Sequence, residues 1–579
     1  MCHGRRREKN IDTLMKKEKI LIYQILPRLF GNVKVQNTIN GTIAENGSGK
    51  MSAFSPEVLQ EIKTMGFTHI WYTGLLEHAT QTDYSTCGIK KDHPAIVKGK
   101  AGSPYAIKDY YDIDPDLADN VPDRMREFEA LVDRTHAEGL KMILDFIPNH
   151  VARQYDSDAK PEGVSDLGST DNIHTTYSVD NNFYYIPGQT FHPDFSLEDN
   201  GSQYSEFPAK ATGNDCFSAY PGKNDWYETV KLNYGIDYFN GGSRHFNPIP
   251  DTWHKMRDIL LFWVSKKVDA FRCDMAEMVP VEFWAWVIPE VKKANPEVLF
   301  IAEVYNPDQY RNYLHVGRFD YLYDKVGMYD TLRNVICGFQ PASDVTRCWQ
   351  SVDDIQSRML YFLENHDEQR IASDFFCKDP RKAIPALGIL AFLNTNPLMI
   401  YAGQELGERG MDAEGFSGLD GRTTIFDYWS VDTLRRWFNK GKVNAKQLTD
   451  EEKSLRETYV SILRSLNKSK AAREGLFYDL MYVNPHSGFF NPYKQFAFLR
   501  KADTEMLLVV ANFEDHDSRT KVFVPGHAFD YLQVDPNKIK GAVNLLTNKR
   551  IDPLIRANEP YELNVKANDI CILKFSLKK

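Results

Sequence analysis

The sequence lacks the features that mark a disulfide-rich or membrane-spanning protein. Its 579 residues include eight cysteines, but none form a CxxC pair or a zinc-like spacing. Such scattered cysteines are typical of reduced thiols rather than of a disulfide framework. No stretch reaches the roughly 18 consecutive apolar residues that a membrane-spanning helix needs. We therefore expect reduced thiols and no membrane partner.

A strong positive charge is also missing. Lys and Arg total 70 against 79 Asp and Glu, a net charge of −9, and the single short basic run lies near the N-terminus. This balance argues against a nucleic-acid partner. The first 19 residues run into the strand-like segment ILIYQILPRLF without a small-residue cleavage site. We interpret residues 1–17 as an N-terminal tail and expect a cytoplasmic protein.

Strand-like and helical segments alternate from about Ile20 to about Leu466. A chain of this length is too long for one hydrophobic core, so several domains are expected. Ser55 and Pro56 predict the start of the first long helix. Eight strand-like segments begin near Ile20, Thr68, Lys141, Val268, Val298, Phe319, Met359 and Pro397. Eight strands alternating with helices predict an α/β fold, the (β/α)8 TIM barrel.

The alternation breaks down twice. Residues 151–248 are rich in Asn, Asp, Gly and Tyr and are too long for a plain loop, so we predict an inserted domain after strand three. The last hundred residues contain strand-like segments separated by turns. The predicted domains are a barrel (18–150 and 249–470), the inserted domain B (151–248) and a C-terminal antiparallel β-sandwich (471–579).

Four predicted strands end on charged or imidazole side chains. The segments are DFIPNH from Asp145, DAFRCD ending at Asp274, FIAEV around Glu303, and FLENHD ending at Asp367. In a parallel barrel each strand is buried along its length and presents its last residues at the C-terminal rim. The sequence therefore predicts that these side chains meet at one end of the barrel.

In this order, the four segments resemble the signature regions of the α-amylase superfamily, glycoside hydrolase family 13. The resemblance implies that Asp274 is the nucleophile and Glu303 the general acid/base of a retaining mechanism. It also implies that Asp367, the third catalytic carboxylate, binds hydroxyl groups of the reacting sugar. A carboxylate below the anomeric carbon and a carboxylic acid beside the leaving oxygen are what this chemistry needs.

The same resemblance assigns four substrate-binding residues. Arg272 lies two residues before Asp274, on the same side of the strand, where its charge would keep the nucleophile ionised. His150 and His366 would hydrogen bond to the sugar. Tyr105, in the segment SPYAIKDYYDIDP, would form a stacking platform for it.

The chain departs from the family at two positions after the nucleophile. Glu277 and Met278 replace the Lys and His that many members carry after the nucleophile. Asn149 matches a family calcium ligand, so a structural calcium is compatible with the resemblance, although its other ligands are not identifiable and no cofactor is required. Aromatic residues of the insertion either stack on sugars or form its core: Phe183, Tyr184, Tyr185, Trp226 and Tyr227.

The leading hypothesis is a retaining α-glucan hydrolase that cleaves short α-linked glucooligosaccharides through a covalent glycosyl-enzyme. A transglycosylase or a disaccharide isomerase of the trehalose synthase type is the alternative, because it would share all the catalytic residues. A non-catalytic glycan-binding homologue is a more remote alternative. The sequence does not decide between α-1,4 and α-1,6 bonds, between endo and exo action, or the oligomeric state.

Overall fold

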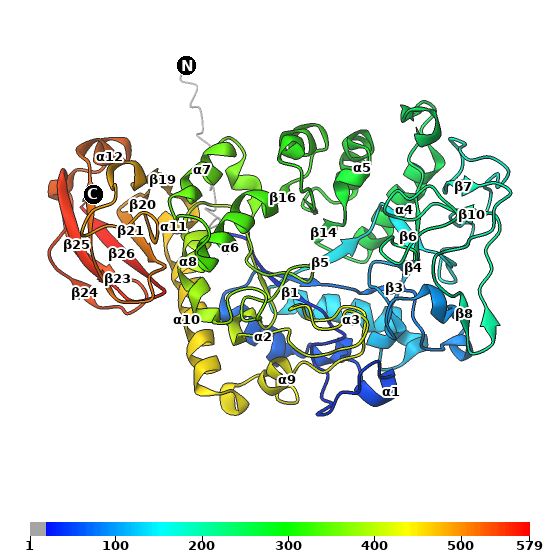
Figure 1. Ribbon diagram of the computed structural model, residues 1–579. Coiled ribbons are helices and arrows are strands. Elements are labelled where there is room, and N and C mark those ends of the chain that lie inside the picture. Colours follow the sequence, from blue (N-terminus) through cyan, green and yellow to red (C-terminus); the bar gives the residue numbers. More distant parts are fainter. Residues whose placement is uncertain (1–18, 579) are drawn as a thin grey trace, which may run out of the picture.

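Eight parallel strands form the centre of the molecule (Figure 1). This computed structural model describes residues 19–578, so the predicted tail at 1–17 lies outside the described residues. The sheet order is β17-β16-β15-β14-β5-β2-β1-β18, and a parallel bridge between Tyr361 and Leu398 closes it into a barrel. The strands are β1 (Leu21–Ile25), β2 (His69–Tyr72), β5 (Lys141–Phe146), β14 (Ala270–Cys273), β15 (Leu299–Ala302), β16 (Tyr321–Tyr323), β17 (Met359–Leu360) and β18 (Leu398–Tyr401). The predicted TIM barrel is confirmed.

The barrel interior is filled by one apolar side chain from each strand. These side chains form a cluster of their own, separate from the larger core outside the barrel. The eight are Ile22, Trp71, Ile143, Ala270, Ile301, Tyr323, Leu360 and Met399. Since side chains of a strand alternate between its two faces, the residue two positions further along each strand also points inward, nearer the C-terminal rim.

Helices cover the outside of the barrel. Ser55 caps α2 by accepting a hydrogen bond from the Val58 amide, as predicted. Between β15 and β16 only a 3-10 turn and a π-helical turn are found, at Pro307–Gln309 and Asn312–Val316. The helices are α1 (Ile43–Asn46), α2 (Pro56–Met65), α3 (Arg124–Ala137), α4 (Asp251–Ser265), α5 (Val281–Ala294), α6 (Asp330–Cys337), α7 (Asp344–Ser351), α8 (Ile384–Phe392), α9 (Asp432–Phe438), α10 (Asp450–Lys468) and α11 (Lys470–Glu474).

The segment between β5 and α4 contains short paired strands, on the right in Figure 1. A small core that includes Phe191, Tyr204 and Tyr227 stabilises it. A further hairpin, β3 (Leu76–His78) with β4 (Ile107–Ile113), lies between β2 and α3. The short strands are β6 (His150–Ala152), β7 (Tyr185–Ile186), β8 (Glu198–Asp199), β9 (Ser202–Gln203), β10 (Ala209–Lys210), β11 (Thr229–Lys231), β12 (Ile236–Asp237) and β13 (Ser243–Arg244).

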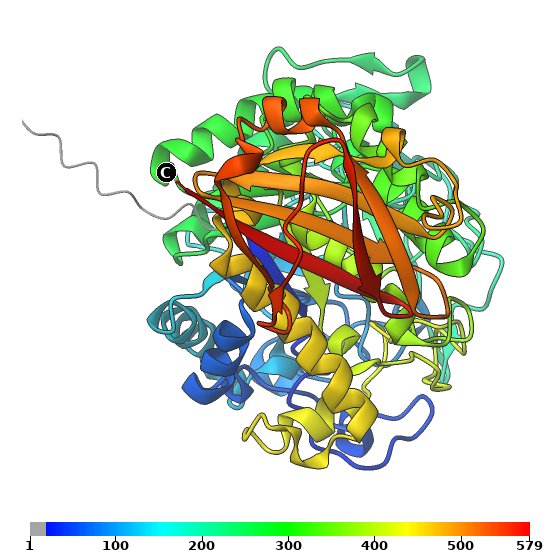
Figure 2. The ribbon, with the colours of Figure 1, turned by 90° about the vertical axis from the view of Figure 1, so that its left-hand side faces the viewer.

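Two antiparallel sheets form the C-terminal part, seen in Figure 2. One has six strands in the order β19-β20-β21-β26-β23-β24, and the other pairs β22 with β25. Their strands are β19 (Leu476–Asp479), β20 (Gln495–Ala502), β21 (Glu505–Asn512), β22 (Ser518–Val524), β23 (Ile539–Asn544), β24 (Arg550–Ile551), β25 (Glu559–Val565) and β26 (Asp569–Leu577). A short helix, α12 (Gly526–Tyr531), lies between β22 and β23.

Helix α8 joins these sheets to the barrel. All nine of its residues are buried. At Gly388 an added Cβ would lie 2.1 Å from Cδ1 of Ile570 in β26, so any larger residue would force the Ile570 side chain to move. The buried Arg500 of β20 donates to the carbonyl of Phe392 at the end of α8, at 2.6 Å. The C-terminal sheets are therefore packed directly on the barrel.

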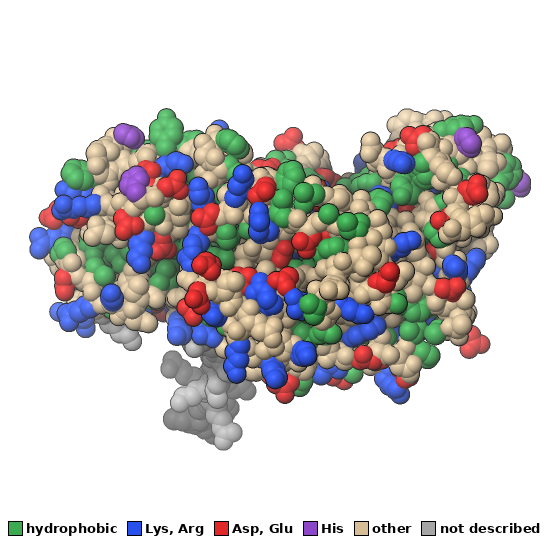
Figure 3. Space-filling view, turned by 60° about the horizontal axis from the view of Figure 1, so that its bottom comes forward, with side chains coloured by type: hydrophobic (Ala, Val, Ile, Leu, Met, Phe, Trp, Pro, Cys, Tyr) green, Lys and Arg blue, Asp and Glu red, His purple; other side chains and the backbone are tan. Residues whose placement is uncertain are grey.

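The helices, the surface charge and the thiols complete the description of the fold. Within residues 19–578, no helix has the length and apolar character needed to cross a membrane. Acidic and basic side chains are interspersed on the face in Figure 3. All seven cysteines that the structure describes are free.

Candidate active site

A polar layer lies above the apolar interior of the barrel. Asp145, Arg272 and Glu303 each follow an inward-facing apolar residue by two positions, on β5, on β14 and just past β15. All three are buried. The period of two along a strand therefore brings side chains from three strands together at the rim, as the sequence predicted.

Arg272 contacts three carboxylates. Its Nη1 donates to Asp274 Oδ1 at 2.7 Å and lies 3.5 Å from Asp145 Oδ1. Its Nη2 forms an ion pair with Glu303 Oε2 at 2.9 Å. One planar guanidinium thus fixes the predicted nucleophile and the predicted general acid/base relative to each other.

The ionisation of Asp274 depends on this contact. Burial raises the pKa of the Asp274 carboxyl well above its usual range, Arg272 lowers it, and the nearby Glu303 raises it again. The Trp71 indole donates a hydrogen bond to Asp145 Oδ2 at 2.8 Å. The positive charge of Arg272 therefore stabilises the ionised forms of neighbouring carboxylates, while Trp71 also contacts one of them, Asp145.

Two further groups contact Glu303, and sequence reasoning missed both. The Tyr305 hydroxyl donates to Oε1 at 2.5 Å, and the Met275 amide donates to Oε2 at 2.8 Å. Burial, followed by the Glu303 charge, raises the pKa of Tyr305, so its hydroxyl remains a proton donor. Met275 has a φ of 43°, in the sparsely populated left-handed region. Tyr305 follows Glu303 by two residues, a spacing that could have revealed it.

His366 lies in a chain of hydrogen bonds next to Asp367. Its Nε2 is 2.6 Å from the Tyr105 hydroxyl and 3.1 Å from Asp367 Oδ2, and its Nδ1 is 2.8 Å from Gln24 Nε2. The Tyr105 and His366 rings are stacked at 5.1 Å. Burial, with Arg272 nearby, lowers the pKa of His366 well below its usual value, so the ring is neutral.

His150 lies on the side of the insertion. Its ring packs against Trp226 at 5.2 Å, and its Nδ1 is 3.1 Å from the Asn149 carboxamide nitrogen. Burial, followed by the charge of Lys231, lowers the pKa of His150 to about 3. His150 is therefore a neutral hydrogen-bonding group at neutral pH.

A cavity of about 570 Å³ opens above this layer. Its volume is within the usual range for small-molecule sites. Five of the seven predicted site residues line it, whereas Arg272 and His366 do not. The lining includes Tyr105, His150, Asp274, Glu303 and Asp367, together with Lys98, Trp226, Glu228, Tyr305, Lys325 and Glu368.

The structure shows which of the insertion's five named aromatic residues lie at the main cavity, and where Glu277 and Met278 lie. Of the five insertion aromatics, Trp226 alone lines the cavity, and the other four are buried: Phe183, Tyr184, Tyr185 and Tyr227. Glu277 and Met278 line a different cavity, where Glu277 accepts a hydrogen bond from the Asn306 amide. Their side chains are not part of the main cavity.

The surroundings of Asn149 do not fit a calcium ion. The buried Lys231 ammonium donates to Asn149 Oδ1 and forms an ion pair with Asp215 Oδ1 at 2.6 Å. The Asn149 and Asp215 oxygens thus both face a positive charge that the chain itself supplies. Calcium requires several free oxygen ligands, so no step of the reaction is assigned to an ion here.

Glu368→Gln should move the acid limb of the pH profile of kcat/KM to lower pH. Burial, and next the charge of Glu303, raises the pKa of Asp367 to about 7, and Glu368 raises it further. If ionised Asp367 holds the sugar hydroxyls, activity falls as pH drops through this pKa, and removing Glu368 lowers the pKa. Glu277→Gln, the same change outside the cavity, is the control. An unmoved acid limb in Glu368→Gln would contradict the assignment.

The comparisons with known proteins agree with this geometry. The family model described as alpha amylase, catalytic domain, matches residues 24–474. A Cereibacter sphaeroides alpha-1,4-glucan:maltose-1-phosphate maltosyltransferase is 27% identical over 35% of this chain and 25% of its own. Alpha-amylase 3 of Dictyoglomus thermophilum is 26% identical over 53% of this chain and 54% of its own. The chain thus spans about a quarter to a half of the length of these relatives.

A solved structure resembles nearly the whole chain. An alpha-amylase from Geobacillus thermoleovorans, complexed with acarbose, superposes with a TM-score of 0.62 at 18% identity. The match covers 97% of this chain and 99% of that one, and at this identity it supports the fold. Because the family model covers more than three quarters of the chain, the protein belongs to the alpha-amylase family, glycoside hydrolase family 13.

Proposed function

We propose that the protein is a retaining α-glucan hydrolase that acts on short oligosaccharides through a covalent glycosyl-enzyme. The observation that carries this proposal is that Asp274 and Glu303 both line the cavity and both form ion pairs with the Arg272 guanidinium. A carboxylate pair that flanks one bond is what the double-displacement mechanism requires.

In the first step, Asp274 attacks the anomeric carbon while Glu303 gives its proton to the leaving oxygen. In the second step, the Glu303 carboxylate takes a proton from water, which attacks the same carbon and releases Asp274. Arg272 favours the ionised nucleophile before attack, and Tyr305 and Met275 orient Glu303. Because the two carboxylates supply both roles, the proposed mechanism requires no cofactor.

The substrate follows from the shape and lining of the cavity. Tyr105 and Trp226 offer aromatic faces, and sugar rings have apolar faces that stack on them. Asp367, which lines the cavity, offers oxygens to sugar hydroxyls. The cavity volume of about 570 Å³ suits a few sugar units. Short α-linked glucooligosaccharides are therefore the proposed substrates.

A transglycosylase or a disaccharide isomerase is the second candidate, favoured by the similarity to a maltosyltransferase. These enzymes form the same glycosyl-enzyme and differ in whether water or a sugar attacks it. A non-catalytic glycan-binding protein is less well supported, because such a protein has no need of a carboxylate pair held by a buried arginine.

Proton NMR during the first minutes of reaction with maltotriose tests the proposal. We expect the new reducing end to appear first as the α-anomer, because two displacements at one carbon restore its configuration. Glucose and maltose as products support hydrolysis, whereas longer maltooligosaccharides or a non-reducing disaccharide support the second candidate. First appearance of the β-anomer would exclude Asp274 as a nucleophile. The Asp274→Asn variant, prepared in parallel, controls for contaminating glycosidases.

A further inference from the structure

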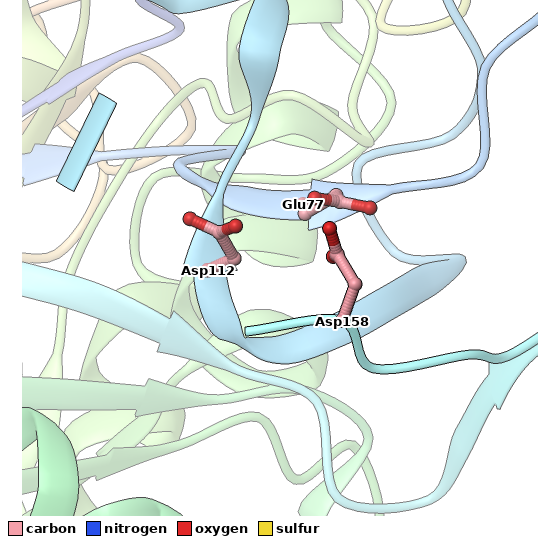
Figure 4. A group of neighbouring side chains, drawn as sticks. All are labelled: Glu77, Asp112 and Asp158. Carbon is pink, nitrogen blue, oxygen red and sulfur yellow. The ribbon is translucent and has the colours of Figure 1, made fainter. Parts of the chain in front are cut away.

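Three carboxylates from separate segments converge away from the catalytic cavity. Glu77 lies on β3, Asp112 on β4, and Asp158 near the start of the insertion. Each offers one oxygen, and these oxygens all lie within 4.8 Å of one another (Figure 4). None of the three lines the catalytic cavity.

Among the residues that the structure describes, no group donates a hydrogen bond to the Glu77 side chain. Its residue is 1% exposed, yet both carboxylate oxygens lack a hydrogen-bonding partner within residues 19–578. The nearest cationic nitrogen, Arg124 Nη2, is 4.0 Å from Oε2. A buried carboxylate without partners is costly, whether it is charged or neutral.

The neighbouring groups do not balance the charge. Arg124 forms an ion pair with Asp112 and approaches Asp158 to 3.9 Å, so one positive charge serves three carboxylates. Lys108 donates to Asp92 Oδ2 at 3.1 Å and to the Lys90 carbonyl instead.

Asp109, opposite Glu77 in the hairpin, adds a fourth carboxylate close by. Its oxygens already accept hydrogen bonds from the Tyr111 and Ala159 amides and from the Ser157 hydroxyl. Counting Glu77, Asp112 and Asp158 against Arg124 leaves an excess of two negative charges when all are ionised.

We propose that Glu77, Asp112 and Asp158 form a binding site for a divalent cation of the calcium type. Calcium is bound by oxygen ligands at about 2.3–2.6 Å, so two oxygens on opposite sides of one ion are about 4.6–5.2 Å apart. The three carboxylate oxygens lie within 4.8 Å of one another, close enough to be ligands of one such ion. Magnesium demands a near-ideal octahedron at about 2.0–2.1 Å and usually keeps several waters, so a cluster of three carboxylates suits calcium better.

The ion would join three parts of the fold. β3 and β4 form a hairpin next to the barrel, and Asp158 belongs to the insertion. β4 begins at Ile107, two residues after Tyr105, which lines the catalytic cavity. The site would therefore stabilise the hairpin and the insertion while leaving the catalytic carboxylates untouched.

Equilibrium dialysis against calcium, after the protein has been stripped with a chelator, tests this proposal without relying on activity. We expect one calcium per wild-type chain and a higher melting temperature in its presence. Glu77→Gln and Asp158→Asn should each weaken binding at least tenfold. Asp158 is exposed, so its variant should fold even if Glu77→Gln does not.

Arg124→Gln gives a prediction of opposite sign. The guanidinium competes with an ion for the same carboxylates, so its removal should tighten calcium binding. Glu451→Gln, which removes an exposed acidic side chain at the start of α10, should leave binding unchanged. The proposal is overturned if the wild type binds no calcium, or if Asp158→Asn binds it as tightly as the wild type.

Discussion

Asp274→Asn and Glu303→Gln should each lower kcat on maltotriose by about 10⁴-fold or more. An amide at 274 cannot attack the anomeric carbon, and an amide at 303 cannot protonate the leaving oxygen. Because both groups act on one bond, the double variant should lose little more activity than either single variant, since groups that act as a unit are not additive. Initial rates measured for the three variants and the wild type check this.

The fold should survive these substitutions. Each replaces a carboxylate with an amide of nearly equal size, and circular dichroism should match the wild type. Glu451→Gln, far from the cavity on an exposed helix, is the matched control and should keep full activity. More than a few per cent of wild-type activity in either single variant, in a preparation free of other glycosidases, would refute the assigned roles.

Arg272→Gln should lower kcat/KM by about 100-fold or more and also destabilise the protein. Without the guanidinium, Asp274, Glu303 and Asp145 lose the cation that all three contact. Removing one partner from a buried ion pair typically costs about 3–5 kcal/mol. The pKa of Asp274 should rise further, because Arg272 is the group that lowers it, and the acid limb of the kcat/KM profile should move to higher pH.

The stability loss should depend on pH with a definite sign. Burial already raises the pKa values of Asp274 and Asp145 in the folded wild type, and loss of Arg272, whose charge lowers both, raises them further above their values in the unfolded chain. The folded state then binds protons more tightly, so the deficit is largest above the folded pKa and shrinks as pH falls. Chemical denaturation of the wild type and the variant at several pH values measures this trend.

Arg272→Lys is the informative companion. It keeps the charge but not the planar fork that contacts Asp274 and Glu303 at once. We expect it to recover part of the lost stability while kcat/KM stays low. If Arg272→Gln kept the wild-type pH profile, Arg272 would not be the group that holds Asp274 ionised.

The sequence by itself determined the barrel and most of the rim. Strands buried along their whole length appear as apolar runs, and the period of two then places Arg272 and Asp274 on one face. Since parallel strands all end at the same rim, Glu303 and Asp367 were expected near them, and the structure places both in the same cavity. The local sequence pattern was sufficient for these residues because side chains alternate along a strand, so a residue's position in the strand decides which face its side chain occupies.

Only the tertiary structure decided which other side chains meet this rim. Gln24 contacts His366, 342 residues away in sequence, and no local pattern specifies such a contact. Trp226 reaches the cavity while its neighbour Tyr227 is buried, because irregular chain has no fixed period. The contact of Lys231 with Asn149 and the convergence of Glu77, Asp112 and Asp158 likewise depend on how the insertion packs on the barrel. These contacts join segments that are far apart in the sequence. They form only when the segments pack together, so no local sequence pattern predicts them.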